Sequence, residues 1–177
     1  MEKTSPIESR EIKYCPFCGN PTIEKFRFGK NRPHCSNCKW THFQDPKVAV
    51  AVLVIHQNEI LLVQRANTPY RGLWSLPAGF MDPYEKPENA AARECKEETG
   101  MNVEIIKFLE LISGREHVEG ADILLVYQAQ LNGGKLQAGD DARQAAFFQT
   151  NQMPPLAFKT THQIIENHFM TLPQKGN

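Results

Sequence analysis

The pattern of hydrophobic and polar positions changes after residues 44–46. Residues 47–55 are almost continuously apolar and rich in β-branched side chains, which predicts a strand buried on both faces. A polar turn at 56–59 separates this strand from an apolar segment, 60–65, which predicts a returning strand and a hairpin. Further strands are expected at 103–111, 123–131 (ended by the Asn132–Gly134 cluster) and 145–149.

Two segments have helical character. Pro87 suits the first turn of a helix, Ala90 to Ala92 favour its interior, and Gly100 suits a left-handed C-terminal position. Near the C-terminus, Thr160–Gln163 resembles a capping box that would begin a second helix. Strands, a central helix, more strands and a terminal helix predict a mixed α/β layer fold.

Length and charge narrow the class of protein. The chain has 177 residues, enough for one ordinary domain and a small appendage, and 20 Lys and Arg balance 20 Asp and Glu. The zero net charge disfavours a general polyanion binder held by a global positive field, so nucleic acid is an unlikely partner, and it leaves a local basic patch open. No apolar run is long enough for a bilayer and residues 1–12 form a polar tail without a signal sequence, so we expect a cytoplasmic protein with no membrane partner.

Four of the five cysteines form two pairs, Cys15/Cys18 and Cys35/Cys38. Two residues lie between the thiols of each pair and 16 residues separate the pairs, which is the spacing of a four-thiolate zinc site. The alternatives are disulfides or a redox motif. Four thiolates leave no open position on zinc, so we expect a structural Zn²⁺ and a zinc ribbon over residues 13–44.

A basic and aromatic stretch separates the two cysteine pairs. It could contact nucleic acid or protein, or its aromatic rings could cover the zinc site and pack on the next domain. Its members are Phe26, Arg27, Phe28, Lys30, Arg32 and His34.

Three carboxylates gather on one side of the central helix. At about 100° per residue, Glu94, Glu97 and Glu98 fall within an arc of roughly 100°. Clustered like charges destabilise a helix, and a hard divalent cation would offset the repulsion. Arg93 is spaced to pair with Glu97, and Cys95 is expected to be a small buried residue on a flank that packs against the sheet. The alternative is a solvated charged face.

The same segment carries a family resemblance. Gly79, Glu85 and the run Arg93–Met101 resemble the complete signature of the Nudix hydrolases, with all seven fixed identities in place. The resemblance implies a Nudix-type mixed-sheet α/β/α sandwich over residues 45–177, preceded by the zinc ribbon. It also implies hydrolysis of a nucleoside diphosphate linked to another group.

Residue roles follow from the resemblance. It implies that Glu94, Glu97 and Glu98 bind catalytic Mg²⁺ or Mn²⁺ together with the backbone carbonyl of Gly79. Glu85 and Arg93 would orient the helix and loop of the catalytic site.

The general base is left open by the resemblance. The family often places a carboxylate before a late strand, where this chain has Gln144. Asp140, Asp141 or a glutamate of the signature could serve instead.

Further motifs favour one subfamily. A four-cysteine ribbon resembles the NADH pyrophosphatases, but residues 102–130 lack their further motif. Residues 44–47, 72–79 and 156–158 resemble plant-type FAD and ADP-ribose pyrophosphatases. This implies an ADP-linked substrate such as FAD or ADP-ribose, cleaved to AMP, and a homodimer. The alternatives are a Nudix enzyme that acts on NADH or oxidised nucleoside triphosphates, and a ribbon binding module with an idle Nudix scaffold.

Candidate substrate contacts lie on both sides of the signature. Arg71 and Arg115 could contact phosphate, and Tyr70, Phe80 and Tyr84 could stack on a base or flavin ring. Each could equally be a surface or packing residue.

Overall fold

The computed structural model describes residues 12–170. The chain divides between Asp45 and Pro46 into two compact units, and each is described by itself. The expected polar tail, residues 1–12, lies outside the described residues except for Ile12.

The first unit is a two-stranded sheet with two cysteine turns. Strands β1 (Ile23–Arg27) and β2 (Lys30–His34) pair antiparallel. In each turn the carbonyl of the first cysteine accepts a backbone hydrogen bond from four residues on: Gly19 N to Cys15 O and Lys39 N to Cys35 O, both 2.9 Å. Gly19 and Lys39 adopt positive φ of 70° and 67°, so the two turns have the same left-handed ending.

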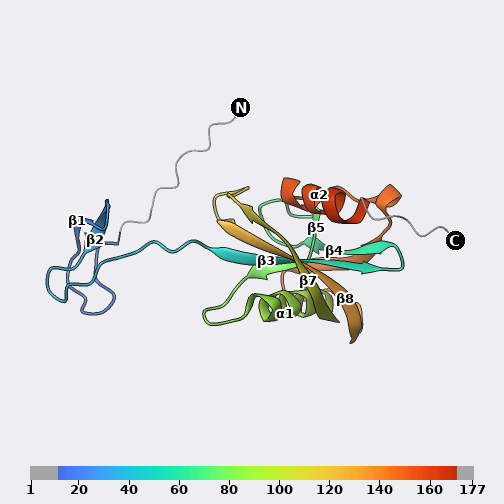
Figure 1. The fold of residues 1–177 in the computed structure, drawn as a ribbon, viewed down its shortest axis with the longest axis horizontal. Coiled ribbons are helices and arrows are strands. Elements are labelled where there is room, and N and C mark those ends of the chain that lie inside the picture. Colours follow the sequence, from blue (N-terminus) through green and yellow to red (C-terminus); the bar gives the residue numbers. More distant parts are fainter. Residues whose placement is uncertain (1–11, 171–177) are drawn as a thin grey trace, which may run out of the picture. The chain divides into compact units, whose positions relative to one another are not determined.

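The second unit holds the remaining elements (Figure 1). Its strands are β3 (Val48–His56), β4 (Glu59–Arg65), β5 (Trp74–Ser75), β6 (Ala78–Phe80), β7 (Met101–Ser113), β8 (Ile123–Gly134) and β9 (Ala142–Phe148). Its helices are α1 (Pro87–Thr99) and α2 (Lys159–Ile165), with a 3₁₀ turn at Thr150–Gln152 and a π turn at Glu166–Met170.

The predicted hairpin forms at its turn, where His56 pairs with Glu59 across a two-residue loop, Gln57 and Asn58, of positive φ. Beyond the turn the two strands part. Strand β3 pairs parallel with β8 and antiparallel with β6, whereas β4 pairs antiparallel with β5 and β9. The sheet is therefore mixed, with order β5-β4-β3-β8-β7 along its main path.

A helix covers each face of this sheet (Figure 1). On one face, Ala91 and Cys95 of α1 pack against alternate residues of β3, including Val52. On the other, Ile164 of α2 packs against Leu53, the next residue of β3. Burial of β3 on both faces and the α/β/α sandwich are confirmed, because successive side chains of one strand enter opposite cores.

Helix α1 has the ends that its sequence predicts. Pro87 is its first residue, and Gly100 closes it in the left-handed conformation with φ 70° while its N–H donates to the Lys96 carbonyl. The chain enters β7 directly at Met101.

Two strand predictions were too short. Strand β7 extends over Met101–Ser113, and β8 continues through the Asn132–Gly134 cluster instead of ending there. Gly134 pairs with Met101 at the end of the ladder, with φ 96°. An added Cβ there would overlap backbone atoms of Gly100 and Met101, so glycine permits the close approach of the two strands.

The predicted capping box at Thr160–Gln163 is wrong. Phe158 is the N-cap residue of α2 and makes no side-chain cap. Instead, the Glu116 carboxylate accepts from the Thr160 backbone N–H at 3.2 Å and from its hydroxyl at 2.6 Å. A carboxylate distant in sequence thus satisfies the free N–H at the start of this helix.

Candidate functional site

The central helix α1 presents two buried carboxylates. Glu94 and Glu98 are 8% and 5% exposed, although both side chains are charged at neutral pH in water. The side chain of Glu97 is 46% exposed on the rim of the same helix face. The three glutamates therefore divide into a buried pair and a solvated third member, because the pair lies four residues apart on the side facing β6.

Strand β6 holds this pair closely. The backbone N–H of Ala78 donates to Glu98 Oε2 at 2.9 Å. The Glu94 carboxylate lies against the Cα of Gly79, so a Cβ at this position would overlap it. The missing Cβ of Gly79 leaves room for the carboxylate beside the backbone of β6.

Arg93 connects the carboxylates of this region. Its guanidinium donates twice to Glu85 at 2.9 Å, once to Glu94 at 2.7 Å and once to Glu97 at 3.0 Å, which confirms the expected pairing with Glu97. It also donates to the Phe80 carbonyl at 3.1 Å. The hydrogen bonds from Arg93 lower the pKa of Glu85, and this planar fork fixes the loop before α1 to the helix.

Burial raises the pKa of both Glu94 and Glu98. For Glu98 the neighbouring Asp141 carboxyl raises it further. Oxygen donors whose negative charges are desolvated and crowded fit a hard divalent cation such as Mg²⁺ or Mn²⁺.

The four cysteines of the first unit form a second donor set. Their sulfur atoms all lie within 4.8 Å of one another, and within residues 12–170 they are the only His, Cys, Asp or Glu group so gathered. The Cys15–Cys38 and Cys18–Cys35 sulfur pairs are 3.5 Å apart. A tetrahedral Zn²⁺ with bonds of about 2.3 Å separates its sulfurs by about 3.8 Å, so the cluster fits zinc and is consistent with a zinc ribbon.

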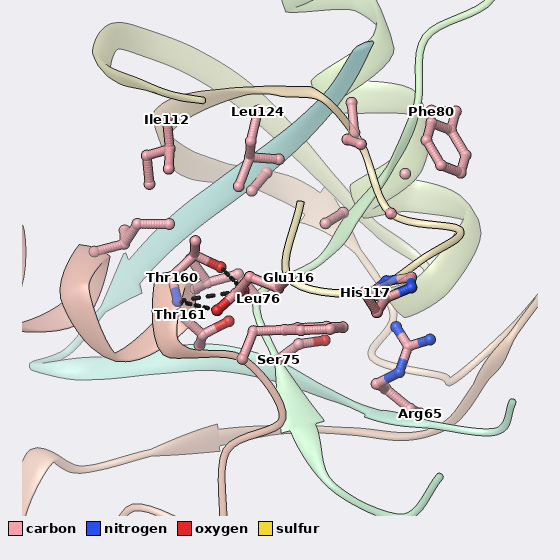
Figure 2. A pocket seen from close by; sticks show the side chains of 18 of the residues that line it. Arg65, Ser75, Leu76, Phe80, Ile112, Glu116, His117, Leu124, Thr160 and Thr161 are labelled. Atoms are coloured by element: carbon pink, nitrogen blue, oxygen red, sulfur yellow. Dashed lines mark hydrogen bonds between the residues drawn. The ribbon is translucent and has the colours of Figure 1, made fainter. Parts of the chain in front are cut away.

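A cavity of about 240 Å³ opens beside β6 (Figure 2). Ala49, Ala51, Ser75, Leu76 and Ala78 line one side of it. The residues of the loop 114–121 other than Arg115 and Val118 also line it, together with the start of α2 and Asp141. Gly79 and Phe80 also line it, which places the cavity next to the buried carboxylates.

The comparisons with known proteins agree with this geometry. The model of the NUDIX domain matches residues 45–169. This chain belongs to the Nudix hydrolase family. It is therefore an enzyme of that family, a pyrophosphohydrolase, and the buried glutamates lie within the matched domain.

Similar proteins include several Nudix enzymes. The chain is 38% identical over 133 residues to an ADP-ribose pyrophosphatase of Methanocaldococcus jannaschii, covering 75% of this chain and 78% of that protein. It is 26% identical to the NAD-capped RNA hydrolase NudC of Vibrio parahaemolyticus, where 84% of this chain spans 55% of the relative. A crystal structure of a NUDIX hydrolase from Nitrosomonas europaea superposes with a TM-score of 0.81 at 30% identity, over 92% of this chain and 95% of that one.

Candidate bases of this Nudix hydrolase differ in position. Gln144 lies in β9 opposite Gln64 of β4, is exposed and does not line the cavity. Asp140 is exposed. Its charge nevertheless helps to raise the pKa of Glu94, so it also lies near the carboxylate pair. Asp141 neighbours Glu98 and lines the cavity, so of the three it is the one that adjoins both the carboxylate pair and the cavity.

The predicted substrate contacts also differ in whether they reach the cavity. Phe80 lines the cavity, whereas Arg71 and Tyr84 are exposed outside it, and Tyr84 has no packing at all. Arg115 forms a bidentate ion pair with Asp122 at 2.6 and 2.8 Å and donates to the Val118 carbonyl. That arginine closes the base of the loop at 114–122 instead of reaching the cavity.

Three side chains that surround Phe158 were not identified together from the sequence. The Arg65 guanidinium lies 5.0 Å from the Phe158 ring, the His117 ring stacks on it at 5.8 Å, and the Tyr70 ring meets it edge-on at 5.4 Å. Arg65, His117 and Phe158 all line the cavity, and Figure 2 shows Arg65 and His117 side by side. Burial lowers the pKa of His117, with Arg65 adding to the effect, so the imidazole favours its neutral form.

None of the helices in the described residues is both long and apolar enough to span a bilayer.

Proposed function

We propose that this enzyme hydrolyses the pyrophosphate bond of an ADP-linked nucleotide, with ADP-ribose favoured over FAD, and releases AMP. The observation that carries the proposal is the buried pair Glu94 and Glu98, which lies against Ala78 and Gly79 of β6. These two residues of β6 also line a cavity suited to part of a nucleotide. ADP-ribose is favoured because the Methanocaldococcus jannaschii relative, which is 38% identical to this chain, is an ADP-ribose pyrophosphatase.

Glu94, Glu97, Glu98 and the Gly79 carbonyl are the residues proposed to hold Mg²⁺ or Mn²⁺. Such a cation, when bound, neutralises phosphoryl oxygens and lowers the pKa of a water ligand. Asp141 is our candidate to accept the proton of the attacking water, since it lies at the cavity beside Glu98. Water then adds to one phosphorus, and the second phosphate leaves.

Arg93 and Glu85 are proposed as positioning residues. The N–H groups of Arg93 donate to three carboxylates and to the Phe80 carbonyl, so none remains directed at substrate. Its contribution is to hold Glu94 and Glu97 in one arrangement while offsetting their repulsion.

The cavity is proposed to receive one half of the substrate. Its volume, about 240 Å³, lies below the roughly 300–1,000 Å³ of sites that enclose a drug-sized ligand, which suits part of a dinucleotide. Arg65 supplies a cation for a phosphate, and the rings of Phe80 and Phe158 supply apolar faces for a base or sugar.

Residues 13–44 are proposed as the structural zinc ribbon and 45–177 as the catalytic domain. Every residue proposed for catalysis lies in the second of these. The proposal of a homodimer is retained and can be tested by sedimentation of the zinc-loaded protein.

Chromatographic product analysis tests the function. Zinc-loaded protein would be incubated with Mg²⁺ or Mn²⁺ and, in separate reactions, with ADP-ribose, FAD, NADH and a nucleoside triphosphate. We expect AMP and ribose 5-phosphate from ADP-ribose at the highest kcat/KM. Glu98→Gln should abolish the reaction, whereas Glu88→Gln, an exposed carboxylate of the same helix, should retain it.

Three outcomes would change the proposal. Inorganic pyrophosphate from the triphosphate as the main product would assign the enzyme to nucleotide cleansing. Preferred cleavage of NADH would assign it to the NADH pyrophosphatases. No cleavage of any substrate under either metal would reject the hydrolytic function of this site.

A further inference from the structure

Charge is distributed unevenly between the two units of this chain. Residues 12–45 carry six Lys and Arg but only two Asp and Glu, whereas residues 46–170 carry eleven and fifteen. Four thiolates and one Zn²⁺ add two negative charges to the ribbon and leave it positive. The zero net charge of the whole chain is therefore an average over a basic ribbon and an acidic catalytic unit.

Four of these cations share one face of the ribbon sheet. In the antiparallel register, Lys25 is directly opposite Arg32, and Arg27 is directly opposite Lys30. Opposed residues of an antiparallel pair project from the same face, and like charges placed there destabilise the pairing. None of the four belongs to an ion pair formed within residues 12–170.

This face also has an unused donor. Arg27 Nε is buried and has no hydrogen-bond partner among the described residues. An anion bound at this face would relieve both the repulsion among the four cations and the unpaired donor.

Aromatic rings adjoin the cations at the tip of the hairpin. Phe28 is 71% exposed although it occupies a turn position with φ 50°, where asparagine or glycine is favoured. Its ring lies 5.5 Å from that of Phe43, and the Arg32 guanidinium lies 4.9 Å from the Phe43 ring. The rings of Phe26 and Phe28 both remain about 70% exposed, so most of their surface is accessible to a ligand.

We propose that this face of the zinc ribbon, Lys25, Arg27, Lys30 and Arg32 with Phe28 and Phe43, binds single-stranded nucleic acid. The cations contact successive phosphates, and the exposed rings stack on bases that are free of a duplex. An acidic peptide would satisfy the cations alone and would leave the rings without a use. The prediction against nucleic acid relied on the net charge of the whole chain, which conceals this local field.

Fluorescence anisotropy would measure the binding. The full-length, zinc-loaded protein without added Mg²⁺ would be titrated onto a labelled 12-nucleotide RNA with a 5′-hydroxyl end, and onto DNA of the same sequence. With four phosphate contacts, log affinity should fall against log salt with a slope of about −2.8. Tighter binding of RNA than of DNA would identify RNA as the ligand, and equal binding would identify single strands of either kind.

Two variants separate the phosphate and base contacts. Lys25→Gln with Lys30→Gln should weaken binding about tenfold at low salt and reduce the slope by about 1.4. Phe28→Asn, which suits the turn, should weaken binding about tenfold with an unchanged slope. The matched control, Lys107→Gln with Lys135→Gln, removes two exposed charges of the catalytic unit and should bind like the unmodified protein.

Equal zinc content and unchanged ADP-ribose cleavage would establish that each variant is folded. The proposal is overturned if the ribbon variants bind as tightly as the control. It is also overturned if polyglutamate or duplex RNA of equal charge binds as tightly as the single strand, since neither presents unstacked bases.

Discussion

The two units of this protein gather negative metal donors in opposite ways. In the ribbon, four thiolates lie within 4.8 Å of one another, and the buried side chains of the described part of that unit are Cys15, Cys35 and His34. In the catalytic unit, two carboxylates are buried at the edge of a sheet whose cores are complete on both faces. The described part of the ribbon therefore has no apolar core beyond its cysteines, whereas the catalytic unit has one on each face of its sheet.

The chemistry of each donor set indicates what a metal bound there would contribute. A closed set of four soft sulfur donors stabilises a fold and offers no open position for a reacting water. Hard oxygen donors beside a cavity leave room for water and phosphate, and the surrounding core provides the free energy that keeps like charges together. Variants of both units can test whether the ribbon metal is structural and the metal of the catalytic unit takes part in the reaction.

Loss of the zinc cluster should have the largest effect. Cys35→Ser removes a buried ligand, and structural zinc contributes about 10–16 kcal/mol to such modules. We expect zinc content to fall to near zero and the amide signals of β1 and β2 to collapse in NMR spectra. Cleavage of ADP-ribose under Mg²⁺ should persist, because the cavity is lined only by the catalytic unit. Loss of both properties together would show that the units are not independent.

Arg93→Lys should have the next largest effect. One ammonium cannot reproduce a fork that serves Glu85, Glu94 and Glu97. We expect kcat/KM for ADP-ribose to fall about 30-fold, as for other residues that orient metal ligands. Arg143→Lys, an exposed change on β9, is the matched control and should be silent. Full activity of Arg93→Lys would argue that the fork is not needed.

Gly79→Ala should cost about tenfold in kcat/KM, or about 1.4 kcal/mol. The new Cβ would overlap the Glu94 carboxylate and displace it from β6. Because the φ of Gly79 is not in the left-handed region, the backbone accepts alanine, and the thermal midpoint should change little. Steady-state kinetics and calorimetry on the same sample separate the two effects. An unchanged kcat/KM would place the working position of Glu94 elsewhere.

Asp122→Asn should have the smallest effect. The hydrogen bond from Arg115 lowers the pKa of Asp122 below its ordinary value of about 3.9. The pair therefore stabilises the folded state fully above about pH 4, and this contribution is lost as the pH falls through the lowered pKa of the folded state. The pair is at the surface and closes the loop at 114–122. We expect KM for ADP-ribose to rise less than about threefold at pH 7 with kcat unchanged. A fall in kcat would assign Arg115 a direct part in the reaction.

The catalytic helix could be predicted because its information is local. The spacing of Glu94, Glu97 and Glu98 and the ends at Pro87 and Gly100 depend only on helix geometry, and the structure places each end as expected. The cysteine turns could be predicted because their information is also local: each turn is complete within five residues.

The cavity could not be predicted, because it depends on sheet topology. Arg65, His117 and Phe158 come from the end of β4, a loop and the start of α2, and nothing in their spacing along the chain relates them. Glu116 shows the same limit, since it caps a helix 44 residues away. The only feature of the sequence that could have singled out Arg65 is its position as a cation at the end of an apolar strand.

Binding of Mn²⁺ to the zinc-loaded protein would show whether the buried carboxylates hold a catalytic metal. Electron paramagnetic resonance would compare the unmodified protein with Glu94→Gln and with Glu88→Gln. The account predicts a Mn²⁺ site that Glu88→Gln retains and that Glu94→Gln weakens at least about 30-fold, with zinc content equal in all three. Equal Mn²⁺ affinity in all three proteins would contradict a catalytic metal held by the buried carboxylates.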